Sequence, residues 1–292
     1  MEINAKHESE ESTSTAMEPH ELIASRKDWF HSIDFGDGLI SPGIVPLAYL
    51  QRILTDFQLP KRLDGMRVLD IGTYDGFFAF ECERRGAAEV VAIDVNPIDF
   101  YCFHVAHTVL KSRVRYHEMS VYALDEQTLG GKFDLILFPG VFYHLRHFLI
   151  SLDQIWERLK PNGILLMESH VCDGHFVLAD GTSTTLEAMD PRLVKTPLFR
   201  FYRRDELNKG DWSNWFGGNV AAILDCLGSA GFEAKHLASW SVGEASRAAF
   251  EARKIDLKPR EWEHGSYEGM SFQKNADGSW TLIWHDPKDL MR

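Results

Sequence analysis

Two acidic residues that each end an apolar run are the most informative chemical feature of this sequence. Asp70 follows Val-Leu and Asp94 follows Val-Val-Ala-Ile 24 positions later, close to the spacing of about 20 residues in a nucleoside-binding unit. Between them, Gly72 and Gly76 open a turn that leads into a helical stretch. Glycines let the backbone approach a ligand, and an acid that ends the second strand accepts hydrogen bonds from ribose hydroxyls. The pattern therefore predicts a nucleoside-binding α/β unit.

The turn lacks the pattern that binds a pyrophosphate. A dinucleotide site needs G-x-G-x-x-G, whereas this turn has two glycines and carries Asp75 close to Asp70. Negative charge at this position repels phosphate groups. S-adenosylmethionine (SAM) fits instead, because it has a ribose, an adenine, an ammonium group and a sulfonium, but no phosphate. We therefore predict SAM as the ligand, and the missing glycine pattern argues against NAD-dependent oxidoreduction.

Short apolar runs alternate with helical stretches through the middle of the chain. Strands are predicted at 67–71, 89–94, 113–118, 133–138, 163–169 and 232–240, and helices near 76–86, 98–110, 121–129, 147–159 and 217–231. By its period the segment 247–255 suits a helix or a strand, and we favour the strand. Lys160-Pro161-Asn162-Gly163 is expected to be a stop signal between the helix near 147–159 and the next strand. Strands that alternate with helices imply right-handed crossovers and a parallel sheet. The predicted fold class is α/β and Rossmann-like, with a mostly parallel seven-stranded sheet and helices on both faces.

The flanking segments differ in composition from this core. The N-terminus is rich in Glu, Ser and Thr, and the stretch after the fifth strand has scattered Gly, Pro, Thr and aromatic residues that suit substrate contacts. Asp277-Gly278 between apolar runs indicates a hairpin. The predicted segments are a disordered leader (1–17), an N-terminal helical cap (18–60) with helices at 21–30 and 46–57, a core (61–255) with an insert (172–216), and a C-terminal extension with a hairpin (256–292).

Bulk properties restrict the class of protein. The chain has 292 residues, 45% hydrophobic and 25% charged, which are ordinary values for a globular protein. Its formal net charge of −12 disfavours long-range attraction to nucleic acid. The four cysteines are scattered without a C-x-x-C pair, and no apolar run spans a bilayer. These features predict a cytoplasmic protein with reduced thiols and no membrane partner, and they leave the oligomeric state open.

Over roughly residues 60–255 the chain resembles the class I SAM-dependent methyltransferases. Within them it resembles the branch of tRNA wobble-uridine carboxymethyltransferases and their small-molecule relatives. The matching motifs are Leu69–Phe78, Ser120-Val121-Tyr122 and Phe138–His147, with Trp29–Asp34 upstream and Asn214-Trp215-Phe216 and Asn219 downstream. Two departures stand out: Tyr74 replaces the usual middle glycine of the first motif, and no basic RNA-facing surface is evident.

The resemblance implies roles for the residues around the turn. Asp70 and the turn backbone would hold the methionyl portion of SAM, and Asp94 would accept the ribose hydroxyls. The alternatives are a plain tight turn and, for Asp94, a helix N-cap before Pro97 that can coexist with ribose binding. The implied cofactor-binding residues are Trp29 in a lid, Asp70, Gly72, Thr73, Tyr74 and Gly76 in the turn, Asp94, Val95, Ser120 and Val121 around the nucleoside, and Pro139 and Gly140 near the sulfonium.

Three residues are candidates for catalysis. Tyr143 and His144 follow the fourth predicted strand, at whose carboxyl end open α/β sheets bind their ligands. His144 would remove a proton from the acceptor, since an ordinary histidine pKa of about 6.5 leaves the imidazole mostly neutral at pH 7. His31 lies in the aromatic segment that, by the resemblance, closes over the cofactor. The alternatives are a hydrogen-bonded structural histidine and, for His31, an amphipathic surface helix.

Candidate acceptor contacts lie in and after the insert. Arg200 and Tyr202 belong to a basic-aromatic patch that could hold a carboxylate or phosphate, or could be solvated charge beside core aromatics. Trp215 and Asn219 are further candidates for the substrate pocket. A separate group, His170, Cys172 and His175, matches no usual zinc spacing, so no metal site is predicted.

The sequence thus predicts a SAM-dependent methyltransferase that moves a methyl group to an O or N atom of a small metabolite. One alternative is a tRNA wobble-uridine (carboxy)methyltransferase that uses SAM or its carboxylated analogue, with Tyr143 helping to read the extra carboxylate. Another is a non-catalytic module that keeps the methyltransferase fold to bind a partner. The acceptor, and whether a general base is needed, cannot be identified from sequence.

Overall fold

One large sheet organises the part of the chain that the computed structural model describes, residues 17–204, 206–207, 211–243, 245–255, 270–276 and 280–284. Its parallel half has the order β3-β2-β1-β4-β5. These strands are β1 (Arg67–Ile71), β2 (Glu89–Asp94), β3 (Arg115–Glu118), β4 (Phe133–Pro139) and β5 (Leu159–Val171). The predicted parallel core is confirmed, and all five strands end at the same edge of the sheet.

Antiparallel strands complete the sheet beyond β5. β11 (Ala245–Lys254) pairs antiparallel with both β5 and β10 (Phe232–Val242). This path of seven strands confirms the predicted mostly parallel seven-stranded sheet. Two short strands, β8 (Phe199–Phe201) and β9 (Phe216–Gly218), join the end of β5 and were not predicted. They form where the insert returns to the sheet.

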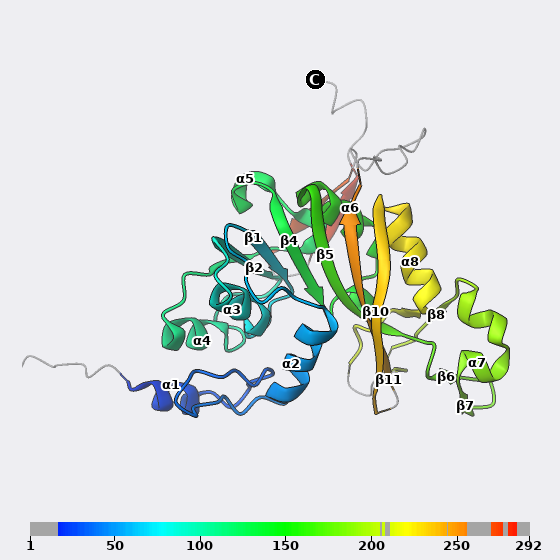
Figure 1. Ribbon diagram of the computed structural model, residues 1–292, viewed down its shortest axis with the longest axis horizontal. Coiled ribbons are helices and arrows are strands. Elements are labelled where there is room, and N and C mark those ends of the chain that lie inside the picture. Colours follow the sequence, from blue (N-terminus) through cyan, green and yellow to red (C-terminus); the bar gives the residue numbers. More distant parts are fainter. Residues whose placement is uncertain are drawn as a thin grey trace, which may run out of the picture.

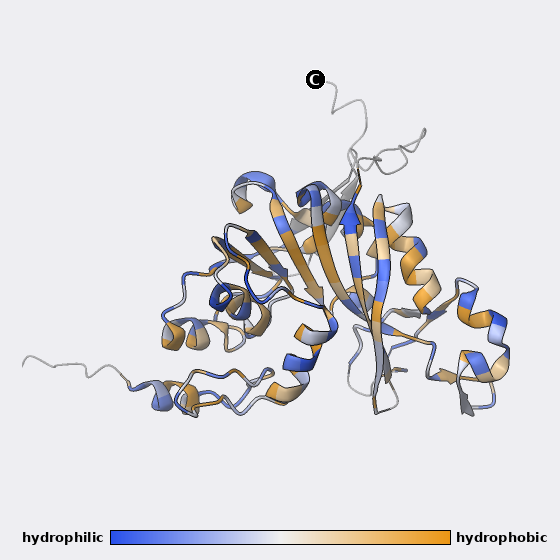
Figure 2. Cartoon of the chain, viewed as in Figure 1, coloured by the Kyte–Doolittle hydropathy of each residue, from blue (hydrophilic) through white to orange (hydrophobic). Residues whose placement is uncertain are grey.

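Helices cover both faces, because side chains of successive strand residues point to opposite sides. Val68 belongs to one apolar cluster and Leu69 to the other. The four inner parallel strands β2, β1, β4 and β5 are hydrophobic over most of their length (Figure 2), as buried parallel strands are, whereas β3 at the edge is polar. One cluster lies under α3 (Phe77–Arg84) and α4 (Phe103–Leu110), and the other under α6 (Phe148–Arg158) and α8 (Val220–Ser229).

The N-terminal segment has two short helices joined by an irregular stretch. These are α1 (Pro19–Ser25) and α2 (Leu47–Asp56). The helix predicted at 21–30 ends at Ser25, and Arg26 already has an extended backbone. The helix ends there because Phe30 and His31 give their backbone N–H groups to Asp75 of the core rather than to a continuing helix.

Other boundaries also differ from the predictions for tertiary reasons. α4 begins at Phe103 rather than near 98, and the helix predicted at 121–129 is divided into η1 (Val121–Ala123) and α5 (Glu126–Leu129). The helix predicted from 217 begins at Val220, because the preceding residues form β9. β5 begins at Leu159, so the expected stop signal at 160–163 lies inside this strand.

The insert and the tail add small elements. The insert contains β6 (Phe176–Val177), β7 (Ser183–Thr184), α7 (Leu186–Met189) and η3 (Pro191–Lys195), and η2 (Phe142–His144) follows β4. Figure 1 shows the cap and the insert on opposite sides of the edge toward which β4 points. The predicted hairpin is confirmed by β12 (Met270–Lys274) and β13 (Trp280–Trp284), whereas 1–16, 256–269 and 285–292 lie outside the described residues. In the described part, every helix is too short or too polar to cross a membrane.

Candidate functional site

The neighbouring strands β1 and β4 mark the point where the strand order reverses. Chain connections from β1 run toward β2 and β3, whereas β4 continues to β5 on the other side. Ligands of open α/β sheets bind in the crevice beyond such a point. Gly72 has a left-handed φ of 71°, and a Cβ there would clash with the Val141 side chain. The turn after β1 and the loop after β4 are therefore in contact.

Asp70 ends β1 with a carboxylate that is only partly satisfied. The residue is 0% exposed, and its Oδ2 accepts a hydrogen bond of 2.7 Å from Thr73 Oγ1. Its Oδ1 has no hydrogen-bond partner among the described residues. Burial raises the pKa of Asp70 to about 7. Because buried polar atoms normally have partners, this oxygen fits a cationic or hydrogen-bond-donating ligand.

Asp94 at the end of β2 is held by its own loop. Its Oδ1 accepts from the backbone N–H and the side-chain amide of Asn96, both at 3.1 Å, and its Oδ2 accepts from the Tyr74 N–H at 3.2 Å. Burial raises the pKa of Asp94. Each carboxylate oxygen can accept more than one hydrogen bond, so the local role leaves acceptor capacity for ribose hydroxyls. Val95 beside it is 48% exposed and could pack on an adenine.

Tyr74 takes the backbone conformation that a glycine would have. Its φ of 53° is left-handed, which costs a non-glycine residue roughly 1–2 kcal/mol. Its ring stacks on Tyr101 with centroids 3.6 Å apart, and its centroid lies 4.6 Å from that of Phe30. Aromatic pairs contribute about 0.5–1.5 kcal/mol beyond burial, which offsets much of the strain. Tyr74 thus links the turn to the cap and to the loop after β2.

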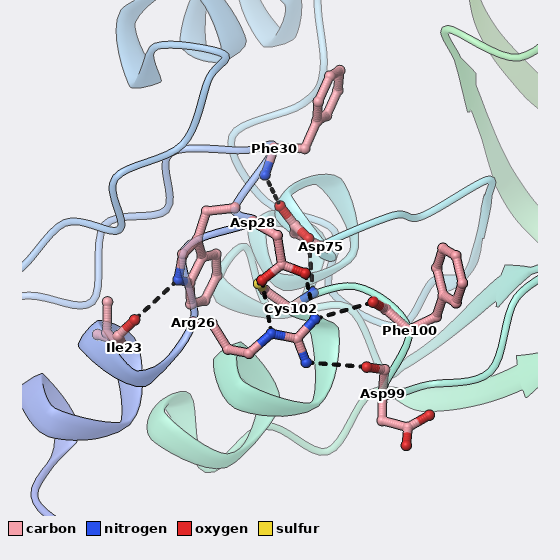
Figure 3. Close-up of polar contacts among 9 residues, drawn as sticks. Ile23, Arg26, Asp28, Phe30, Asp75, Asp99, Phe100 and Cys102 are labelled. Carbon is pink, nitrogen blue, oxygen red and sulfur yellow. Dashed lines mark hydrogen bonds and ion pairs between the residues drawn. The ribbon is translucent and has the colours of Figure 1, made fainter.

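Asp75 is a buried residue whose role the sequence analysis missed. Its Oδ2 accepts from the backbone N–H groups of Phe30 at 2.7 Å and His31 at 2.8 Å, and its Oδ1 accepts from that of Cys102 at 3.0 Å. Figure 3 shows its carboxylate between the cap and the start of α4. Burial raises the pKa of Asp75, and the three hydrogen bonds oppose this rise. Asp75 therefore fastens the cap over the glycine turn.

Arg26 also joins the cap to the loop between β2 and α4. Its guanidinium donates to the carbonyl oxygens of Asp99 at 3.1 Å and Phe100 at 3.0 Å, and it forms an ion pair with Asp28 (Figure 3). These carbonyls belong to the loop between β2 and α4. Trp29 is fully buried, and its indole Nε1–H donates to the Ile23 carbonyl at 3.1 Å. Trp29 therefore packs inside the cap.

His31 lies against the glycine turn. It is buried, its Nδ1 has no partner among the described residues, and its ring centroid is 5.9 Å from that of Tyr74 and 6.2 Å from that of Phe77. Burial lowers its pKa to about 3. The imidazole is therefore neutral near pH 7, with one polar atom free for a ligand.

The end of β4 borders a buried ion pair. Pro139 is the last residue of β4, and the N–H of Gly140 (φ 71°) donates to the Glu168 carbonyl at 3.1 Å. The Glu168 carboxylate binds the Arg247 guanidinium through two contacts, one of them 2.8 Å from Nη2 to Oε2. Arg247 in turn lies 4.6 Å from the centre of the Tyr143 ring. Tyr143, in the same turn as His144, thus contacts both this pair and the His144 ring.

His144 is connected to the insert side of the site. Its Nδ1 lies 2.8 Å from Ser213 Oγ, and Ser213 Oγ lies 2.6 Å from Asp211 Oδ1. The N–H of Trp215 donates to the Tyr143 carbonyl at 3.0 Å, so residues 211–215 are joined to η2 at two places. Burial lowers the pKa of His144, while the nearby Asp211 opposes this change. A neutral imidazole in this position is suited to accept a proton.

An open aromatic cleft of about 370 Å³ lies beside this segment. It is lined by Tyr202, Arg204, Trp212, Asn214 and Trp215. Tyr202 and Trp215 were predicted to contact the acceptor, and both line the cleft. Asn214 is buried, and its Oδ1 has no hydrogen-bond partner within the described chain. The cleft therefore offers aromatic surfaces, and Asn214 at its border has a buried amide oxygen without a hydrogen-bond partner among the described residues.

Arg200 and Asn219 were predicted to contact the acceptor, but their side chains form hydrogen bonds that hold the insert in place. Arg200 donates to the Val177 carbonyl at 3.0 Å and to Glu206 at 2.9 Å. The Asn219 side chain caps α8, accepts from the Leu198 N–H, and donates to two further carbonyls. All hydrogen-bonding groups of the Asn219 amide are thus used, and none is left for a substrate.

The remaining predicted positions are placed as follows. Ser120 Oγ accepts from the Tyr122 N–H at 3.2 Å and so caps η1, and Val121 is buried in the apolar cluster. His170 Nε2 lies 2.9 Å from the Tyr202 hydroxyl. Across the residues that the structure covers, no group of three or more His, Cys, Asp or Glu side chains is placed to hold a metal ion.

Comparison with known proteins agrees with this architecture. The family model described as a methyltransferase domain matches residues 47–234. The tRNA U34 carboxymethyltransferase of Hahella chejuensis is 25% identical over 230 residues, which cover 79% of this chain and 57% of that protein. That of Azotobacter vinelandii is 33% identical over 171 residues, which cover 58% of this chain and 46% of that protein. The chain therefore spans about half the length of the curated relatives it matches.

Solved structures share the fold at low sequence identity. The N-terminal domain of EvdMO1, solved in the presence of SAH and D-fucose, has a TM-score of 0.55 and 17% identity, covering 81% of this chain and 95% of that one. The YcgJ protein from Bacillus subtilis has a TM-score of 0.51 and 12% identity, covering 71% and 100%. The predicted Rossmann-like fold is confirmed, and the family match confirms the predicted enzyme class and its methyl donor.

Proposed function

The chain belongs to the methyltransferase-domain family, and we propose that it transfers the methyl group of SAM to an oxygen or nitrogen atom of a small, ring-shaped metabolite. The observation that carries this proposal is the junction of three segments. The glycine turn touches the loop after β4 at Val141, and the same loop is bound to the cleft segment through Tyr143 and His144. One loop thus connects the donor crevice to the segment that lines the cleft.

The residues of the crevice fit SAM. Asp70 has an unpartnered carboxylate oxygen for a cationic group, and Asp94 has acceptor capacity for ribose hydroxyls. Gly72 and Gly140 allow close backbone approach at the ends of β1 and β4. The exposed Val95 side chain would cover the adenine, and the cap fastened by Asp75 would exclude water from this side.

The chemistry requires little from the protein beyond alignment and a proton acceptor. Bound SAM supplies a methyl group that its sulfonium makes electrophilic, and the C–S electron pair stays on sulfur as a thioether. His144 would accept the proton that the acceptor loses as the new bond to carbon forms, and it would later release that proton to water. Fixing the acceptor in the cleft, whose lining segment is bonded to His144 through Ser213, would provide a high effective concentration.

The cleft suggests what kind of acceptor it takes. Tyr202, Trp212 and Trp215 present aromatic surfaces on which a ring can stack. A volume of about 370 Å³ lies in the lower part of the usual range for small-molecule sites. These features favour one substituted ring over a polymer.

The test is transfer of labelled methyl from SAM. The purified protein is incubated with methyl-labelled SAM and a small-metabolite extract, and products are identified by mass shift. We expect label in a small molecule and a loss of at least about 100-fold with His144→Gln. The matched control is His236→Gln, because His236 is an exposed histidine on β10 that also bonds a serine, Ser239. Binding of SAM without transfer to any acceptor would contradict the proposal and favour a non-catalytic module.

A second candidate is modification of the tRNA wobble uridine, which is favoured by the relatives named tRNA U34 carboxymethyltransferase. Arg247 over the Tyr143 ring is a buried cation that could help hold an additional carboxylate on the methyl donor. A parallel arm with bulk tRNA and either SAM or its carboxylated analogue distinguishes the two. Label in tRNA, with salt-dependent binding, would replace the small-metabolite proposal.

A further inference from the structure

Residues 211–213 place a carboxylate and a hydroxyl in line behind the His144 imidazole. Asp211 Oδ1 accepts from both the backbone N–H of Ser213 at 3.0 Å and its side-chain hydroxyl at 2.6 Å. Ser213 Oγ lies 2.8 Å from His144 Nδ1. The three side chains therefore form an unbroken chain of hydrogen bonds that ends at the imidazole.

Counting protons along this chain fixes the tautomer of His144. An ionised carboxylate can only accept, and Ser213 has a single hydroxyl proton. The pKa of Asp211 is lowered, since hydrogen bonds from Ser213 outweigh the effect of its burial, so the carboxylate is ionised near pH 7. The Ser213 hydroxyl must then donate to Asp211 and accept from His144 Nδ1–H. A neutral His144 consequently keeps its lone pair on Nε2.

We propose that Asp211 and Ser213 are positioning residues that hold His144 in the Nδ1–H tautomer, with Nε2 presented as the proton acceptor of the cleft. This inference rests on the proposed function for its purpose, but its geometry stands alone. Trp212 and Asn214 alternate with these two residues along the chain, Trp215 follows directly, and all three line the cleft. One short segment therefore binds the acceptor and orients the base that serves it.

Charged groups on two other elements also act on His144. Burial disfavours the imidazolium most and Arg247 of β11 adds to this effect, whereas Asp211, the Ser213 backbone and Glu168 of β5 favour the imidazolium. Removal of the Asp211 charge in Asp211→Asn should lower the pKa of His144. The acid limb of the pH–rate profile should then move to lower pH while the maximal rate falls, because the developing imidazolium loses a partner. A loss of packing alone would lower the rate without moving this limb.

The direct test is nitrogen NMR of the full chain with ¹⁵N-labelled histidine, in which His144 signals are assigned by their loss in His144→Gln. Wild type should show a proton on Nδ1 and a bare, pyridine-like Nε2 at pH 7.5. In Ser213→Ala a proton should appear on Nε2 in a large fraction of molecules, and Ser213→Thr, which keeps the hydroxyl, should restore the wild-type pattern. Ser239→Ala, at the His236 pair, should leave His144 unchanged.

Two results would overturn the inference: a proton on His144 Nε2 in wild type, or an unchanged tautomer in Ser213→Ala. SAM affinity measured by calorimetry on each variant checks that the fold and the donor crevice are intact. Once the acceptor has been identified, Ser213→Ala should lower kcat about 10-fold while KM changes little. If His144 has the predicted tautomer but the protein methylates no acceptor, the proposed function is wrong and the inference about the hydrogen-bond chain still holds.

Discussion

Replacing Asp75 should destabilise the cap, because the buried Asp75 carboxylate binds backbone N–H groups of the cap and of the start of α4. Asp75 is 0% exposed and accepts from three backbone N–H groups, those of Phe30, His31 and Cys102. In Asp75→Ala all three donors lose their partner inside the protein. Each buried donor left without a partner costs about 1–3 kcal/mol, and water entering the gap recovers part of it. We expect a loss of about 3–6 kcal/mol in the free energy of unfolding.

Asp75→Asn is the milder variant. The asparagine side chain has one carbonyl oxygen, which can replace either Oδ1 or Oδ2 of the aspartate but not both. At least one of the three backbone N–H groups is therefore left without an acceptor. The neutral amide also removes the cost of a buried charge, which raises the pKa of Asp75 in the wild type. A net loss of about 1–3 kcal/mol follows, or roughly 3–9 °C in Tm for a chain of this size.

The assay is urea unfolding combined with hydrogen exchange measured by mass spectrometry. Peptides from 26–45 should exchange faster in both variants, whereas those from β4 and β5 should change less. Asp64→Asn is the control, because its ion pair with Arg62 is exposed and contributes little. If Asp75→Ala is as stable as Asp64→Asn, and 26–45 stays protected, the reasoning about the cap is wrong.

Two further predictions concern charges in the site. Glu168→Gln should cost about 3–5 kcal/mol of stability in urea unfolding because it leaves the Arg247 guanidinium buried without its partner, and adding Arg247→Met should recover much of the loss. Burial raises the pKa of Asp70 to about 7, so its ionised fraction, which favours a cationic ligand, rises from about a tenth at pH 6 to about a half at pH 7. SAM affinity by calorimetry should therefore rise about fivefold over this interval in wild type and stay flat in Asp70→Asn.

The parallel core and the places of Asp70 and Asp94 at its strand ends were predictable because their signals are local. Apolar runs that end in Asp70 and Asp94 define two strands, and the incomplete glycine pattern between them distinguishes this turn from a dinucleotide site. The replacement of the usual middle glycine of the first motif by Tyr74 was also visible in the sequence. Its left-handed backbone and its stack on Tyr101 were not, since they depend on a loop that follows the next strand.

The cap and the insert were less predictable because distant hydrogen bonds decide their structure. The helix predicted through Phe30 ends early, and α4 starts late, because Asp75 takes backbone donors from both segments. An acid in a turn carries no sequence signal for such partners. Asn219 is similar: its type suits a substrate contact, but a helix cap and two carbonyls use its amide completely. Asp211 and Ser213 lie in an insert without periodicity, so only the fold brings them to His144.

Calorimetric titration of the full chain with SAM tests the central claim most directly. We expect one SAM site in wild type. The SAM affinity of Asp94→Ala should be about 10- to 100-fold weaker, since hydrogen bonds to a charged group contribute about 1.5–3 kcal/mol. Asp64→Asn should bind as wild type does, and thermal unfolding of each variant confirms an intact fold. Wild type without measurable binding, or equal affinity in Asp94→Ala, would contradict the account.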